Sequence, residues 1–95
     1  MIHAIDGSQP HETYKGWENF LSQQCEVASI VDGVTHYYYS NCNYIVFPDG
    51  TLIENFGFWG NNLMRRVARD GADIVLARLL EQRAELKELL AQLGG

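Results

Sequence analysis

Two cysteines and three histidines are the side chains of this chain that could carry nucleophilic catalysis or bind a metal: Cys25, Cys42, His3, His11 and His36. A thiolate beside an imidazole is a common nucleophilic pair, but no recognisable motif flanks either cysteine. The sequence also has neither a Cys-x-x-Cys nor a His-x₃₋₅-His pattern, the usual local sign of zinc. We therefore expect no catalytic residue, no metal and no cofactor, while an enzyme that pairs a cysteine with a histidine stays a minor alternative.

Acidic side chains are concentrated in the first two thirds of the chain. The net charge is −5, but residues 1–60 hold seven acids and one base, whereas residues 61–95 hold five acids and six bases. An anionic surface repels phosphate and attracts cationic partners. Residues 25–56 contain neither Lys nor Arg. Since contacts to phosphate dominate nucleic-acid affinity, we expect no direct binding of nucleic acid.

Tyrosines and other aromatic residues accompany these acids. Tyrosine offers a large contact area with a polar tip and is enriched at protein interfaces. We therefore expect a surface that binds another protein through a basic patch of that protein. The candidate partner-binding residues are Glu26, Asp32, Tyr37, Tyr39, Asp49, Glu54, Phe58 and Trp59.

The one basic cluster is formed by Arg65, Arg66 and Arg69. Two acids follow the last two of these arginines at i+4 spacing, which is typical of a solvated helix face. The same arginines could alternatively bind an acid or a phosphate.

Two turns must position these residues. Asp32-Gly33 has the composition of a two-residue type I′ hairpin turn, and Pro48-Asp49-Gly50 is also typical turn chemistry. Around them, the sequence predicts an α+β fold with a four-stranded antiparallel β-meander. The predicted strands are 27–31, 34–40, 44–47 and 51–56.

A regular register, with Val31 opposite Val34, places Val27 and Ile30 on opposite faces of the sheet. Neither face is cleanly polar, although an antiparallel sheet with one wet face should alternate. We therefore expect helices on one face and a helix, a second subunit or a partner on the other. Cys25 and Cys42 begin next-but-one strands, roughly 9.5 Å apart and beyond disulfide reach, so free thiols are expected.

Helices are predicted both before and after the meander along the chain. A short helix over 14–24 has Thr13 as its N-cap, and residues 1–12 form a short strand or an irregular arm. Helices over 62–70 and 72–93 follow, and the last is expected to be long and leucine-rich. The helical wheel of this last segment gathers its leucines on one broad stripe.

The leucine stripe predicts self-association, because a long helix outruns strands of about six residues. We expect residues 84–95 to project and to pair two copies of the chain, unless the helix over 14–24 folds back on them. The candidate dimerisation residues are Leu79, Leu86, Leu89, Leu90 and Leu93.

Taken together, 95 residues of which 46% are hydrophobic fit one domain over 1–95. The N-terminus has no signal-peptide pattern and no apolar run approaches the ~20 residues of a membrane span, so we expect a cytoplasmic protein. We expect a non-catalytic acidic protein-binding module, similar in character to small phage-encoded inhibitors that occupy a nucleic-acid-binding surface. The alternative is a small-ligand-binding domain with an aromatic pocket between sheet and helices.

Overall fold

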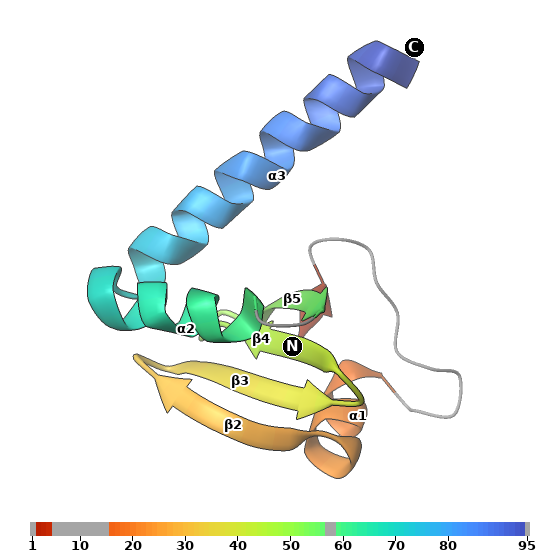
Figure 1. Cartoon of the computed structure of the whole chain (residues 1–95). Helices are drawn as coiled ribbons and strands as arrows, with labels where there is room; N and C mark the ends of the chain where they lie inside the picture. The colour runs from red at the N-terminus through yellow and green to blue at the C-terminus, as the bar shows by residue number, and fades with distance from the viewer. Residues whose placement is uncertain (1, 5–15, 57–58, 95) are drawn as a thin grey trace.

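The computed structural model describes residues 2–4, 16–56 and 59–94 of the chain (Figure 1). Over these residues, a five-stranded sheet and three helices confirm the predicted α+β class. The elements in chain order are β1 (His3–Ala4), α1 (Trp17–Gln24), β2 (Glu26–Val31), β3 (Val34–Tyr39), β4 (Cys42–Val46), β5 (Thr51–Phe56), α2 (Trp59–Asp70) and α3 (Ala72–Gly94).

Four strands form the predicted antiparallel meander, and a fifth joins it from the N-terminal segment. The spatial order is β1-β5-β4-β3-β2. β1 runs parallel to β5, with His3 opposite Thr51 and Ala4 opposite Leu52. The sequence indicated a short strand or arm in this segment but gave no partner for it. With β1 on one side, β2 forms the other edge of the sheet.

The hairpin turns depend on residues in the left-handed region of backbone space. The predicted turn at Asp32-Gly33 is confirmed, with φ values of 50° and 77°. Ser40 and Asn41 make a further turn of this kind without glycine, with φ values of 47° and 66°. Asn41 Oδ1 accepts a hydrogen bond from the Tyr38 hydroxyl at 3.1 Å, which helps to hold that turn.

A β-bulge at Ala28 overturns the regular register predicted for β2. The pairs nearest the turn are as predicted, but Val27 lies opposite Tyr37, where the regular register places it opposite Tyr38. Ala28 is the extra residue, and an extra residue exchanges the faces of everything that precedes it. The bulge therefore moves Val27 onto the face that carries Ile30 and Tyr37.

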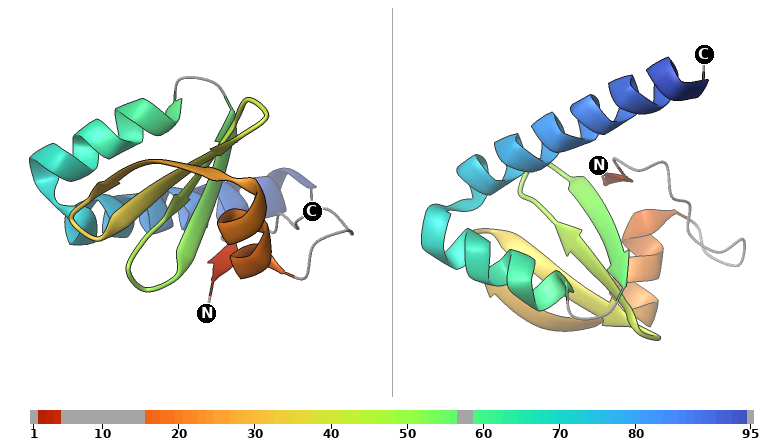
Figure 2. Two further views of the ribbon diagram at one scale, coloured as in Figure 1. Left: turned by 90° about the horizontal axis from the view of Figure 1, so that it is seen from below. Right: turned by 45° about the horizontal axis from the view of Figure 1, so that its top comes forward.

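Both faces of the sheet carry an apolar cluster, which confirms that neither face is left as a plain solvated surface. On one face, here called the α2 face, Ile45 and Phe47 pack with Leu63 of α2 and with the start of α3. On the other, the α1 face, Tyr44 packs with Trp17 of α1. Consecutive strand residues point to opposite faces, and Figure 2 shows α1 and α2 on opposite sides of the sheet.

The α2 face also buries one polar pair. His36 Nε2 lies 2.6 Å from Asn43 Oδ1, and both side chains are buried. In the tautomer with a proton on Nε2, the imidazole donates to the amide oxygen. A buried polar group with a partner avoids most of the desolvation cost, so the pair fits the core.

A tight joint between α2 and α3 is fixed by a side chain from far away in the sequence. Gly71 has a φ of 93°, which a glycine adopts readily, and its N–H donates to Val67 O at 2.9 Å. The next N–H, that of Ala72, donates to Asp32 Oδ2 at 2.8 Å across 40 residues of sequence. The β2–β3 turn thus caps the N-terminus of α3.

Among its described side chains, α3 packs on the fold over its first turns. Ala72, Val75 and Leu79 are buried, whereas Leu89 and Leu93 are 52% and 77% exposed. Figure 1 shows the C-terminal half of α3 extending past the sheet. α3 spans 23 residues, close to the predicted range 72–93, and Leu89 and Leu93 lie beyond the turns that pack on the sheet. Among the described helices, none combines the length and the hydropathy of a membrane-spanning segment.

Replacing the distant cap tests its contribution to stability. We expect Asp32→Ala to lower the free energy of unfolding by about 1 kcal/mol, because Ala72 N–H loses its acceptor. For a domain of this size that loss lowers Tm by roughly 4–8 °C. Chemical and thermal denaturation measure it, with Glu26→Ala, an exposed acid of the same hairpin, as the control. Equal stability of the two variants would contradict the cap.

Candidate functional site

On the β2–β3 hairpin, part of the α1 face is left exposed by the residues that the structure describes. Val27 and Ile30 are 55% and 65% exposed. Cross-strand pairing places Thr35 beside Ile30, and Tyr37 beside Val27, on this same face. Figure 2 shows α1 under one end of the sheet, with the turn end of the hairpin reaching past it. These four residues form what we call the hairpin face.

The bulge at Ala28 is what makes this surface continuous. Val27 and Ile30 are three residues apart, a spacing that puts side chains on opposite faces of a regular strand. With Ala28 as an extra residue, both valine and isoleucine pair with β3 residues of the α1 face. The sequence interpretation missed both residues, since a bulge leaves no signal in the alternation of a six-residue strand.

The four predicted partner-binding acids do not form one cluster. Asp32 caps α3, and Asp49 Oδ1 accepts the N–H of Thr51 at 2.9 Å within its turn. Glu26 is exposed and pairs with Tyr38, which belongs to the α2 face. Glu54 is half-buried on the α1 face in β5, which β4 separates from the hairpin, so these acids do not line one site.

The predicted aromatic residues also divide. Tyr37 is half-buried on the hairpin face, and Tyr39 is 37% exposed while its ring meets Phe20 edge-on at 5.5 Å. Phe58 lies outside the described residues. Trp59 begins α2, and its side chain is also outside the description. Tyr37 is therefore the predicted aromatic residue that lies within the hairpin face.

Aromatic rings fill the space between the sheet and α1. Trp17, Phe20 and Tyr44 lie within 5.3–5.9 Å of one another, centroid to centroid. Edge and tilted contacts of this kind stabilise a core. These rings of α1 and β4 thus pack on each other, and their packing gives no support to the expected aromatic ligand pocket at this place.

The cysteines and the buried histidine lie on different faces. Cys25 and Cys42 are free, half-buried thiols that pack with the α1-face cluster. His36 belongs to the α2 face, where it bonds Asn43. Burial, and then the neighbouring Cys42, raise the pKa of the Cys25 thiol to about 11. Cys25 is therefore a protonated thiol at neutral pH, and His36 is not placed to activate it.

Metal coordination finds no support in the described ranges. No group of three or more His, Cys, Asp or Glu side chains there could hold a metal ion. Of the remaining histidines, His11 falls outside the description and the side chain of His3 does too.

The first of the predicted dimerisation leucines, Leu79, is not on the surface of the monomer. Leu79 is buried in the α2-face core, where it packs with α2. Leu89 and Leu93 are exposed on the projecting half of α3. The side chains of Leu86 and Leu90 are not among those described. Any seam between copies therefore begins after Leu79.

Comparisons with protein families, with curated proteins and with solved structures find no match to this chain. The proposals about function therefore rest on the geometry of the hairpin face, the thiols and α3.

The raised pKa of Cys25 predicts slow thiol chemistry. Because burial favours the neutral thiol, the thiolate forms only as the pH approaches about 11 instead of the ordinary 9.0. At pH 8 we expect Cys25 to react with iodoacetamide roughly a hundredfold more slowly than in the unfolded chain, since only the thiolate reacts. Mass spectrometry of the Cys25 peptide measures the rate, and the rate should still be rising above pH 9. Equal rates in the folded and unfolded chain would contradict the burial.

Proposed function

We propose that this chain is a non-catalytic protein-binding domain, and that its hairpin face binds a basic surface of a partner protein. The main support is the exposure of Val27 and Ile30 beside Tyr37 on an incompletely covered sheet face. Exposed apolar patches with a polar rim are characteristic of protein interaction sites. A tyrosine beside two aliphatic residues is a typical interface core.

The charge of the surroundings supports a basic partner. No Lys or Arg occurs from residue 25 to residue 56, and the exposed acids Glu26, Asp32 and Asp49 lie on this part of the chain. The imidazole of His36 is buried and adds no exposed cation. Anionic side chains on the same domain speed association with a cationic surface, even where they do not line the contact itself. The same acids would repel the phosphates of a nucleic acid, which need cationic side chains for binding.

A basic patch is the electrostatic footprint of proteins that bind nucleic acid, and we infer that the partner's surface is of this kind. Occupying it would make this chain an inhibitor by competition, the mode of small phage-encoded inhibitors. β2 is an edge strand, so a partner could in principle add a strand to it. The bulge disturbs the edge of β2 and discourages such pairing, so the proposal does not use strand addition. The face of the hairpin, rather than its edge, is the proposed contact.

We further propose that α3 joins two copies of the chain through its projecting half. The helix stripe that is buried at Val75 and Leu79 continues along the same side of the helix to Leu93. The same apolar stripe on a second copy of the chain can pack against it. Residues 81–94 carry three acids and two bases, so two copies meet there without the repulsion of their acidic halves.

Substitution at Ile30 tests the hairpin face. A partner is isolated with the wild-type chain, purified and titrated, and we expect Ile30→Lys to weaken its binding at least about tenfold, because Lys adds like charge and removes the apolar contact. The matched control is Leu80→Lys, an exposed leucine of α3, which should bind as the wild type does. Glu54→Gln should reduce the dependence of affinity on salt. The absence of any partner, or equal loss in the Leu80 variant, would overturn the proposal.

Light scattering tests the association of α3. We expect a particle of twice the 10.8 kDa of one chain, and Leu93→Glu should return it to the monomer because two like charges would enter the seam. Ala91→Glu adds the same charge at an exposed position about 160° around the helix from Leu93, and should leave the mass doubled. A wild-type monomer at high protein concentration would exclude this mode of assembly.

A further inference from the structure

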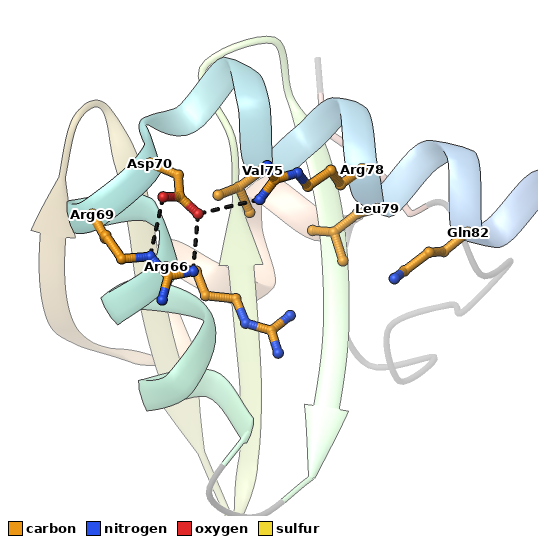
Figure 3. A pocket seen from close by; sticks show the side chains of 7 residues that line it. All are labelled: Arg66, Arg69, Asp70, Val75, Arg78, Leu79 and Gln82. Carbon is orange, nitrogen blue, oxygen red and sulfur yellow. Dashed lines mark hydrogen bonds and ion pairs between the residues drawn. The ribbon is translucent and has the colours of Figure 1, made fainter.

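Three arginines converge on a cleft between α2 and α3 (Figure 3). The cleft has a volume of about 250 Å³, and its lining residues are Arg66, Arg69, Asp70, Val75, Arg78, Leu79 and Gln82. The sequence interpretation had noted the arginines of α2 but not Arg78, which α3 adds because the joint at Gly71 folds it back toward α2. The cleft is separate from the hairpin face.

The cleft is cationic in a chain that is anionic as a whole. Arg66, Arg69 and Arg78 contribute three positive charges and Asp70 one negative charge, which leaves two positive charges. Each guanidinium is a planar fork of N–H donors that matches carboxylate or phosphate oxygens. Arginine does not lose its charge at any ordinary pH.

Asp70 orients two of these arginines. Its carboxylate accepts hydrogen bonds from Arg69 Nε and Nη2, both at 3.0 Å, and from Arg78 Nη1 at 3.3 Å. The Arg69 hydrogen bonds lower the pKa of Asp70, so that the carboxylate stays ionised. The side chains of Arg69 and Arg78 are still 71% and 64% exposed. They are thus held in place and open to a ligand.

The remaining lining gives the cleft a mixed character. Val75 and Leu79 are buried and supply apolar surface, while Gln82 adds a side-chain amide. A volume of about 250 Å³ lies just below the range of roughly 300–1,000 Å³ that is usual for small-molecule sites. It therefore suits a compact charged group that carries a short apolar body.

We propose that the α2–α3 cleft binds a phosphate monoester as its dianion. A phosphate monoester carries ~1.5 to 2 negative charges at pH 7, which matches the two net positive charges of the lining. Bidentate contacts between guanidinium groups and phosphate oxygens are strong and directional. The phosphate can belong to a small metabolite or to a phosphorylated residue of a peptide, and both sources share this chemistry.

NMR titration of the full chain tests the site, with inorganic phosphate and then phenyl phosphate as probes and the arginine Nε–H signals as the readout. We expect both probes to shift the signals of the cleft arginines, with phenyl phosphate binding more tightly because its ring contacts Val75 and Leu79. Acetate, a monoanion, should bind at least about tenfold more weakly at the same ionic strength, because it neutralises only half of the charge.

Variants separate this site from a general attraction of anions. Arg66→Gln and Arg78→Gln should each weaken the binding of phenyl phosphate by about tenfold, because a charged hydrogen bond is lost. Arg65→Gln removes the same charge from an exposed position of α2 outside the lining and should leave binding unchanged. Equal loss in all three variants, equal affinity for acetate, or no shift at all would overturn the proposal. A phosphoserine peptide that binds more tightly than phenyl phosphate would identify a protein source, and the reverse order would identify a small molecule.

Discussion

One hydrogen bond links the β2–β3 turn to the start of α3. Asp32 Oδ2 accepts the N–H of Ala72, so the β2–β3 turn caps the helix that begins 40 residues later. The bond fixes where α3 starts and, together with the positive φ of Gly71, the direction in which it leaves α2. The arginine cleft and the projecting half of α3 both depend on that direction. Asp32, an exposed acid predicted to contact a partner, therefore also has a role in the fold.

The second constraint is a sheet that is apolar on both faces. α2 and the first turns of α3 cover one face, but α1, with eight residues, covers only part of the other. An eight-residue helix spans roughly 12 Å, which is shorter than a six-residue strand at about 20 Å. Among the described elements, none covers the hairpin face, where Val27 and Ile30 are exposed. The proposed binding surface therefore follows from the unequal lengths of the elements.

The sequence predicted what depends on local chemistry. The turn at Asp32-Gly33 and the antiparallel meander were predictable, because glycine and its neighbours restrict the backbone there. The bulge at Ala28 was not, since two cross-strand registers fit the same short apolar run. The same shift brought Val27 to the face of Ile30, so the exposed apolar pair of the candidate site could not be read from alternation. Arg78 was missed for a different reason, because only the α2–α3 joint brings it to α2.

Charge separates the proposed surfaces as clearly as the fold does. The sheet segment from residue 25 to residue 56 has no Lys or Arg, whereas six of the seven bases follow residue 60. A partner attracted to the hairpin face is therefore repelled by the cleft, and an anion attracted to the cleft is repelled by the sheet. Pairing through α3 would add a second hairpin face without bringing the acidic sheets into contact. Two such faces on one particle would bind a partner with two sites more tightly than either face alone, because the second contact becomes intramolecular.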